Sequence, residues 1–391
     1  MGERRLPSRG LLVHHSRMTP IQRLPASLTP LDTARSALLD GLEPVAPIAL
    51  RLAEALGCVA AKMPALKAIP PADVAAADGF ALRARDIAGA SSYSPLPLIK
   101  PPVFVEVGAP MPEGCDCVLA ADAIDQTGPL TEVLTDAIPG QGVRRMGGDI
   151  AEGISVMAPG RRIRSLDLLV ARAAGLEWIS VRRPRLRLLD VPADLGHTIT
   201  AQLIPEVAGA AGAEVVVTAA AARDARSIAA MIDASACDVL VTTGGSGTGR
   251  ADAVISALAA RGAVMAHGIA LQPGRTAAAG RIGRTPVIAL PGAPDQALAA
   301  WWALVLPVLD RLCGLEPRQR VTLPLARKIA SHVGIAEIVL LERNAGAWMP
   351  LAVGELSLEA IARSDAWLLV PSEAEGFAAG APLDAYLLRD W

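Results

Sequence analysis

The stretch VLVTTGGSGTGRAD, residues 239–252, joins a short apolar run to a loop with four glycines and then to a helix-forming segment. The run Val239–Thr243 predicts a buried strand. Glycine permits positive φ angles, so neighbouring backbone N–H groups can converge on an anion, and the dipole of a following helix adds to the attraction. The loop therefore predicts a phosphate site, with a ligand-free glycine turn as the alternative. The residues expected to bind the phosphate are Gly244, Gly245, Ser246, Gly247, Thr248 and Gly249.

Further apolar runs flank this stretch and alternate with alanine-rich segments of helical periodicity. They occupy residues 186–191, 214–219 and 286–290. Such alternation predicts an α/β domain over residues 185–315, with a central parallel sheet and helices on both of its faces. In open sheets of this kind ligands bind at the carboxyl ends of the strands, which is where the glycine-rich loop begins.

Two more loops are expected at that edge of the sheet. The strand Pro286–Leu290 is followed by a turn that two prolines and a glycine fix, namely Pro291, Gly292, Ala293 and Pro294. Before it comes a second turn, Gln272, Pro273, Gly274 and Arg275. The guanidinium of Arg275 can bind an anion through two parallel hydrogen bonds, and a solvated surface charge is an equal alternative.

Asp252 closes the glycine-rich stretch at the start of the predicted helix. A carboxylate there can cap backbone donors or hold a hydrated Mg2+ against a phosphate, and capping is the commoner use. We expect His267 to be structural or to line the pocket rather than to act as a base. Cys115 and Cys117 form a CxC without a nearby histidine, a pattern that favours two strand residues on one face over a metal site.

The remaining sequence predicts several smaller parts. Residues 1–27 form a basic tail, and residues 64–148 carry short apolar runs between Pro, Gly and Asp, as in a β-rich insert domain. A helical linker domain is predicted from residues 28–63 and 149–184, with helices at 32–42 and 49–57. Residues 316–391 read as a small C-terminal β domain. The sequence thus predicts a multi-domain α/β protein.

Composition excludes several classes of function. The 37 basic and 39 acidic residues leave a net charge of −2, which argues against a nucleic-acid partner. The longest charge-free apolar run, Ala297–Leu309, is shorter than the roughly 20 residues of a membrane span and is interpreted as a core or interface helix. No lysine lies between Lys100 and Lys328, so a P-loop is excluded. Five scattered cysteines give no disulfide framework and favour the cytoplasm.

The order of short motifs along the chain resembles the MoeA/gephyrin E-domain family of molybdopterin molybdotransferases, from about Leu28 to the C-terminus. The motifs are PPADVAAADGFA (70–81), GAPMPEGCDCV (108–118), VRRMGGDIAEG (143–153), PGRRI (159–163), RRPRLRLLD (182–190), TTGGSGTGRAD (242–252), QPGRT (272–276) and LPGAP (290–294). The resemblance implies a homodimer of four-domain chains. It also implies a reaction in which adenylylated molybdopterin and molybdate, with Mg2+, give molybdenum cofactor and AMP.

Carried over to this sequence, the resemblance assigns catalytic roles to Asp78, which would position molybdate or water, and to Asp252. It implies that Asp252 and Asp194 bind Mg2+. It further implies that the residues from Gln272 to Arg275, together with Pro291, Gly292 and Pro294, bind the substrate. The sequence departs from the family at Val107, Gln272, Arg275 and Ala293, where the family has threonine, lysine, lysine and asparagine.

Three functional hypotheses follow. The first is an active molybdotransferase that supplies a molybdoenzyme or acts with a cofactor-synthesis partner. The second is a binding protein of the same fold that carries molybdopterin or cofactor without insertion chemistry, an interpretation that Val107, Gln272, Ala293 and a shortened loop after Leu195 favour. The third, a nicotinamide-dependent enzyme, is disfavoured because the glycine-rich loop does not match GxGxxG.

Overall fold

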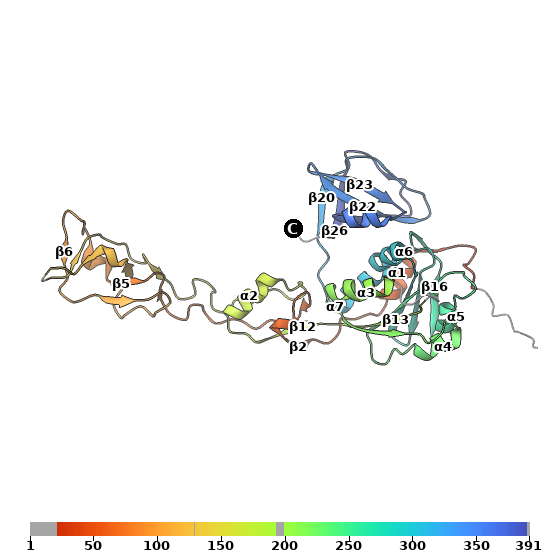
Figure 1. The fold of residues 1–391 in the computed structure, drawn as a ribbon, viewed down its shortest axis with the longest axis horizontal. Coiled ribbons are helices and arrows are strands. Elements are labelled where there is room, and N and C mark those ends of the chain that lie inside the picture. Colours follow the sequence, from red (N-terminus) through yellow and green to blue (C-terminus); the bar gives the residue numbers. More distant parts are fainter. Residues whose placement is uncertain (1–21, 129, 193–198, 389–391) are drawn as a thin grey trace, which may run out of the picture. The chain divides into compact units, whose positions relative to one another are not determined.

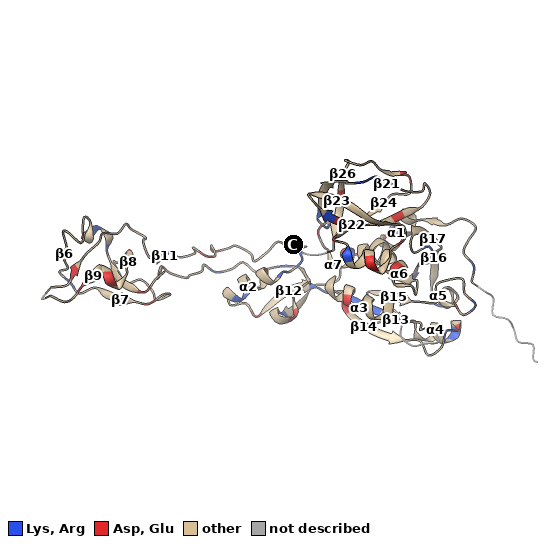
Figure 2. Ribbon diagram, turned by 45° about the horizontal axis from the view of Figure 1, so that its top comes forward, with Lys and Arg blue, Asp and Glu red and all other residues tan. Residues whose placement is uncertain are grey.

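The computed structural model describes residues 22–128, 130–192 and 199–388. Contacts divide the chain into two compact units (Figure 1). One unit combines Met1–Val45 with Pro184–Trp391 and is called the α/β unit below. The other is Ala46–Arg183 and is called the insert unit. Acidic and basic residues alternate along both (Figure 2), in keeping with the small net charge.

A six-stranded sheet forms the centre of the α/β unit. Its strands lie in the order β14 (Glu214–Ala219), β13 (Arg185–Asp190), β15 (Val239–Thr243), β19 (Thr285–Leu290), β18 (Ala278–Ile282) and β16 (Ala263–His267). The first four are parallel, as predicted, whereas β18 pairs antiparallel with both β19 and β16, so the sheet is mixed. Only residues 283–284 join β18 to β19, a connection that suffices for a hairpin but not for a parallel crossover.

Helices cover both faces of this sheet, which explains why β15 is buried along its whole length. Leu186 and Leu188 of β13 belong to the larger core, while Leu189 belongs to the core on the other face. The larger core includes residues of α1 (Leu31–Leu39), α3 (Ile199–Ala210), α6 (Pro294–Ala300) and α7 (Leu306–Cys313). The opposite core includes residues of α4 (Ala225–Met231) and α5 (Val254–Arg261).

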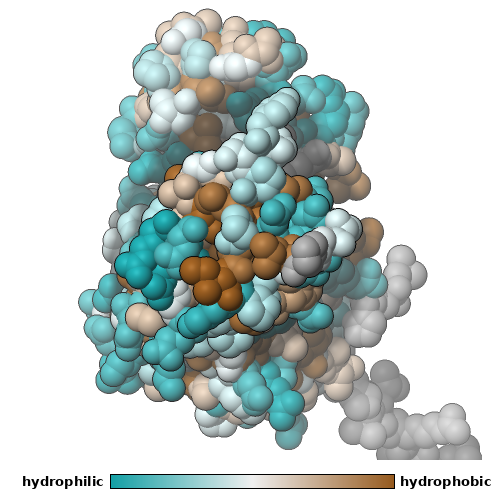
Figure 3. Space-filling view, turned by 90° about the vertical axis from the view of Figure 1, so that its left-hand side faces the viewer, coloured by the Kyte–Doolittle hydropathy of each residue, from teal (hydrophilic) through white to brown (hydrophobic). Residues whose placement is uncertain are grey.

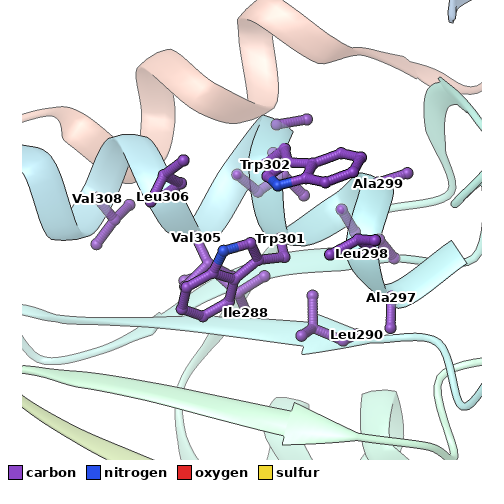
Figure 4. Close-up of a cluster of buried hydrophobic side chains, with 14 of the residues drawn as sticks. Ile288, Leu290, Ala297, Leu298, Ala299, Trp301, Trp302, Val305, Leu306 and Val308 are labelled. Carbon is purple, nitrogen blue, oxygen red and sulfur yellow. The ribbon is translucent and has the colours of Figure 1, made fainter. Parts of the chain in front are cut away.

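The segment Pro294–Cys313 is a continuous apolar helix in which α6 and α7 are joined by a π-helical turn, η4 (Trp301–Val305). Its length and composition are those of a membrane span, but 78% of its most apolar window is buried inside the protein. The side chain of Trp301 lies beside Ile288 of β19, and Trp302 lies on the other side of the helix (Figure 4). The segment is therefore a core helix, one of the two interpretations that its sequence suggested.

The predicted helix over residues 49–57 is wrong. Residues Ile48–Arg51 form a strand, β2, and only Leu52–Glu54 make a short 3-10 turn, η1. Strand β2 pairs with β12 (Trp178–Arg182), which also pairs with β3 (Val59–Ala60), so tertiary pairing overrides local helical periodicity. The helix α2 (Ser165–Ala173) packs in the same core as these strands.

The rest of the insert unit consists of short strands, as the short apolar runs between Pro, Gly and Asp predict. One sheet has the order β7 (Val103–Val105), β5 (Gly79–Leu82) and β8 (Cys117–Leu119), and another has the order β6 (Leu96–Pro97), β10 (Glu132–Val133) and β9 (Ile124–Asp125). Strands β4 (Val74–Ala75) and β11 (Val143–Arg144) form a pair, and η2 (Ala84–Ile87) and η3 (Ala121–Ala123) are 3-10 turns.

A second large sheet contains the C-terminal strands and recruits two strands from earlier in the chain. Its order is β1 (Thr29–Pro30), β17 (Ile269–Gln272), β22 (Ala336–Asn344), β24 (Ala366–Val370), β26 (Pro382–Leu387) and β20 (Arg320–Pro324), with β23 (Ala347–Val353) also paired to β22. The pair β21 (Ile329–Ala330) and β25 (Gly376–Phe377) and the helix α8 (Leu358–Arg363) complete it.

Strand β17 matters for function because it ends at Gln272, the first residue of a predicted binding turn. Gln272 is paired with Glu337 of β22, so this turn lies where the C-terminal sheet meets the central region of the chain. Trp302, Trp367 and Tyr386 stack in series between η4 and that sheet, with ring centroids 5.2 and 4.8 Å apart. Residues 28–45 likewise contribute β1 and α1 here, so contacts group them with the α/β unit rather than with residues 149–184.

Candidate functional site

The glycine-rich loop begins directly at the carboxyl end of β15, where the sequence predicts it. Gly244 and Gly245 have φ angles of +79° and +70°, a region that side chains other than glycine rarely adopt. A Cβ on Gly244 would lie 2.7 Å from the carbonyl oxygen of Val191, and one on Gly245 would lie 2.8 Å from Val254 Cγ2. Both conformation and space therefore require glycine at these two positions.

The carbonyl groups of the loop are held from one side by two side chains. Gln22 Nε2 donates to the carbonyl oxygens of Gly245 (3.2 Å) and Gly247 (2.8 Å), and Gln22 Oε1 accepts from the N–H of Ile255 (2.9 Å). His267 Nε2 lies 3.0 Å from the carbonyl oxygen of Ser246, so this ring nitrogen must be the protonated one. The contact gives His267 the structural role that the sequence favours.

Three consecutive amide groups in the middle of the same loop point to no described acceptor, whereas the N–H groups of Gly244 and Gly249 are bonded. Within the part of the chain that the structure describes, the N–H groups of Gly245, Ser246 and Gly247 meet no hydrogen-bond acceptor. The buried hydroxyl of Ser246 also has no partner there. Because an anion can satisfy several such donors at once, the loop has the chemistry of an oxyanion or phosphate site.

Replacing Gln22 by methionine should loosen this loop. The variant keeps the volume of the side chain but removes three hydrogen bonds in a buried place, at a cost of about 1–3 kcal/mol. We expect hydrogen exchange at the Ile255 amide to accelerate at least about tenfold, since 1.4 kcal/mol corresponds to a factor of ten. The control is Arg23→Met, because Arg23 is exposed. Equal exchange in both variants would contradict a holding role for Gln22.

Two cavities lie along this edge of the α/β unit. One has a volume of about 340 Å³ and is lined by Val191, Arg223, Gly244, Gly245, Gly247, Asp252, Thr276, Pro291, Gly292, Ala293 and Gln296. The other has a volume of about 690 Å³ and is lined by Gln272, Pro273, Gly274, Arg275, Asp295, Gln296, Gly354, Glu355, Leu356 and Ser357. Gln296 lines both. We call them the glycine-loop cavity and the arginine cavity.

The cavities bring together most of the residues predicted to bind substrate. The glycine-rich loop and the Pro291–Gly292 turn share the first cavity, and a Cβ on Gly292 would lie only 3.5 Å from Gly244 Cα. The turn from Gln272 to Arg275 lines the second cavity, where Arg275 is exposed. Four predicted residues line neither cavity, namely Ser246, Thr248, Gly249 and Pro294.

Asp252 lies at the glycine-loop cavity with both carboxylate oxygens engaged. Oδ1 accepts from Arg223 Nη2 at 2.8 Å, and Oδ2 accepts from the N–H of Gly249 at 2.9 Å. The side chain is only 16% exposed. Asp252 therefore bonds a backbone donor of its own loop rather than capping α5, whose N-cap residue is Ala253 and has no side-chain cap hydrogen bond, and it forms an ion pair that the sequence does not predict.

These contacts do not fit a divalent cation. Mg2+ needs several oxygen ligands, yet an Asp252 oxygen already bonds a guanidinium. Across residues 22–128, 130–192 and 199–388, no three His, Cys, Asp or Glu side chains are grouped so that they could hold a metal ion. Asp194, the other predicted ligand, lies outside the described residues.

Asp78 belongs to the insert unit. It is exposed immediately before β5, and its Oδ1 accepts from the N–H of Val107 at 2.7 Å. A Cβ on the following residue, Gly79, would lie 2.1 Å from the carbonyl oxygen of Leu119, so the Asp-Gly turn is fixed by close strand packing. Its carboxylate is thus held by the backbone and remains open to solvent.

The structure adds three residues that sequence reasoning missed: Arg223, Gln296 and Gln22. Arg223 precedes Asp224, whose side chain caps α4 by accepting from the N–H groups of Arg226 and Ser227. An Arg-Asp pair before a helix is a recognisable cap signal, but it does not reveal where the arginine points. Nor does a single glutamine in a basic tail indicate a distant partner.

The CxC pair shows no sign of metal chemistry. Cys117 is fully buried in β8, and burial raises the pKa of its thiol to about 11. Burial also raises the pKa of Cys115. At neutral pH the thiol form prevails at both positions, whereas a metal ligand requires the thiolate. The interpretation of both cysteines as strand residues on one face holds in part, because Cys117 lies in β8 whereas Cys115 precedes the strand and packs against a different cluster.

Comparisons with known proteins agree with this arrangement. The family described as "MoeA N-terminal region (domain I and II)" matches residues 29–175, and that described as "Probable molybdopterin binding domain" matches residues 196–311. The chain is 30% identical over 318 residues to molybdopterin molybdenumtransferase 2 of Mycobacterium tuberculosis, covering 70% of this chain and 77% of that one. It is 26% identical over 360 residues to the molybdopterin molybdenumtransferase of Synechococcus elongatus, covering 81% and 88%.

The fold is similar to the crystal structure of a molybdopterin biosynthesis MoeA protein from Pyrococcus horikosii, with a TM-score of 0.72 and 24% identity over 93% of this chain and 100% of the other. The matching families, the relatives and the fold agree with the resemblance that the motifs suggest. The chain therefore belongs to the family of molybdopterin molybdenumtransferases.

Proposed function

We propose that this protein inserts molybdate into adenylylated molybdopterin, yielding molybdenum cofactor and releasing AMP. The observation that carries the proposal is the glycine-loop cavity, which Gly245 and Gly247, with unpaired amide groups, line together with the Pro291–Gly292 turn. The names of its relatives, molybdopterin molybdenumtransferases, support the same reaction.

In this proposal each of the two cavities binds a different anionic group of the substrate. The free N–H groups of Gly245 and Gly247, which line the glycine-loop cavity, bind a phosphate, because backbone donors hold an anion without side-chain rearrangement. Arg275 binds a second anionic group in the arginine cavity, where it takes the place of a lysine of the family. Asp78 positions molybdate or water, and Asp252 fixes the glycine-rich loop through Gly249.

Mg2+ was implied by the resemblance, but no step here is assigned to it, because Asp252 is already bonded to Arg223 and Gly249. We further propose, from the resemblance, that the protein is a cytoplasmic homodimer that supplies a molybdoenzyme or acts with a cofactor-synthesis partner. All five cysteines lie in the described part of the chain and form no disulfide, which suits a reducing compartment.

The test is to incubate the purified protein with adenylylated molybdopterin and molybdate and to follow AMP release together with cofactor formation. We expect turnover that falls at least about 100-fold in Asp252→Ala, because the loop loses its link to Gly249 and Arg223 is left without its partner. Turnover that is unchanged in this variant would contradict the role given to Asp252.

A second candidate function is a carrier that binds molybdopterin or cofactor without inserting molybdenum. Ala293 favours it, because this residue lines the glycine-loop cavity at a position where the resemblance expects an asparagine. Tight binding of adenylylated molybdopterin with no AMP release would support the carrier and refute the transferase. Absence of binding would refute both.

A further inference from the structure

We propose that the guanidinium of Arg223 neutralises the negative charge of Asp252 at the glycine-loop cavity, as a divalent cation otherwise would. A phosphate group then binds there without Mg2+. The inference rests on the proposed function in that it concerns the phosphate-bearing end of the same substrate. It starts from an ion pair, Arg223 with Asp252, whose nitrogen and oxygen are 2.8 Å apart.

The charges of the cavity give the pair its importance. Among the described residues that line the glycine-loop cavity, which leave out 193–198, Arg223 and Asp252 are the charged ones. Without Arg223 the lining would carry one negative charge, which repels a phosphate in a partly desolvated place. With Arg223 the lining is neutral, and the free amide groups of Gly245 and Gly247 can attract the anion unopposed.

Arg223 is held in place by the ends of two elements. Its Nη1 donates to the carbonyl oxygens of Pro192 (3.0 Å) and Val191 (3.4 Å), just beyond β13, and its Nε donates to that of Ala251 (3.4 Å), before α5. The side chain is 23% exposed. Such a guanidinium is preorganised, because its contacts are made before the substrate arrives and little side-chain entropy remains to be lost.

The same contacts disfavour a metal ion at Asp252. An ion bound to Oδ1 at about 2.1 Å, the usual Mg2+ distance, would lie within about 5 Å of the Arg223 nitrogen that bonds this oxygen. The two positive charges would repel each other in a partly buried site. Arg223 and a divalent cation are therefore alternatives at this carboxylate.

The proposal is tested by titrating AMP into the purified full chain, once with excess EDTA and once with excess Mg2+. Binding to the unaltered protein should differ less than about threefold between the two conditions, because the cavity is already neutral. In Arg223→Gln, binding in EDTA should weaken at least about tenfold, and Mg2+ should restore much of it, because Asp252 is then free to bind the ion.

Three further variants separate the effect of charge from that of structure and one cavity from the other. Arg223→Gln combined with Asp252→Asn makes the cavity neutral again and should bind AMP within about threefold of the unaltered protein in EDTA. Arg284→Gln removes one positive charge from the exposed turn between β18 and β19 and should leave binding unchanged. Arg275→Ala tests the arginine cavity. If this variant loses AMP binding while Arg223→Gln keeps it, the phosphate binds away from Arg223 and the inference is overturned.

The outcomes distinguish this inference from the proposed function. A tenfold or greater gain of AMP affinity with Mg2+ in the unaltered protein would overturn the inference, and so would AMP binding that is absent in both conditions. Normal, Mg2+-independent AMP binding without any turnover of adenylylated molybdopterin would refute the proposed transferase and leave the inference intact. Turnover that requires Mg2+ would refute the inference alone.

Discussion

Gly244→Ala should lower the rate of AMP release from adenylylated molybdopterin at least about 100-fold. The residue has a φ of +79°, at which alanine costs about 1–2 kcal/mol. Its Cβ would also lie 2.7 Å from the carbonyl oxygen of Val191, which belongs to the backbone just beyond β13 and cannot turn away as a side chain could. The loop must move to relieve this contact, and a displacement of about 1 Å at a reaction site can cost a factor of 100.

The matched control is Gly283→Ala. Gly283 also has a positive φ, +58°, but a Cβ there would meet nothing within 4 Å. This variant should lose only the conformational cost, about 1–2 kcal/mol of unfolding free energy, and keep its turnover. Turnover and thermal unfolding are measured on both variants. If Gly244→Ala loses no more turnover than Gly283→Ala, the close approach to Val191 does not fix the loop.

The architecture of the α/β unit was accessible from sequence because its strands are buried on both faces. Val239–Thr243 has no charged residue and is buried on both faces, so its largely apolar run identifies it as a central strand. The antiparallel pair β18 and β19 was missed, although Gly283-Arg284 between two apolar runs is a hairpin signal. The expectation of a wholly parallel sheet arose from reading the alternation of strands and helices without this turn.

The helix predicted over residues 49–57 shows where local periodicity fails. Its leucines recur at spacings compatible with a helix, but Ile48–Arg51 pairs with Trp178–Arg182, more than 120 residues further along the chain. Local sequence also does not indicate which apolar side chains are exposed, such as those of Val103 and Phe104. Hydrophobic areas bordered by hydrophilic ones are visible on the surface (Figure 3). A pairing partner distant in sequence, rather than the local spacing of leucines, therefore decides that Ile48–Arg51 is a strand.

The candidate site likewise has parts that local sequence predicts and parts that it does not. Its loops were predictable because glycine and proline at strand ends constrain the backbone locally. Arg223 was not, since its partner Asp252 is 29 residues away, and Gln22 bonds a loop more than 220 residues away. Neither contact leaves a pattern in sequence, yet one sets the charge of the cavity and the other holds the loop that borders it.

Trp301→Ala should cost about 3–5 kcal/mol of the unfolding free energy of the α/β unit, the usual range for removing a buried tryptophan. Trp301 is 2% exposed and belongs to the core that joins η4 to Ile288 of β19 and to the helices α1 and α7 (Figure 4). The indole is too large for neighbouring alanines, such as Ala297, to fill the cavity that remains. Calorimetry should show a large fall in the midpoint of the transition that contains this unit.

Trp178→Ala in the insert unit provides the control, because Trp178 is 49% exposed and its replacement should cost about 1 kcal/mol. Equal losses in the two variants would mean that the apolar helix Pro294–Cys313 contributes no more to stability than a surface residue does, against its burial beneath the sheet that carries the site.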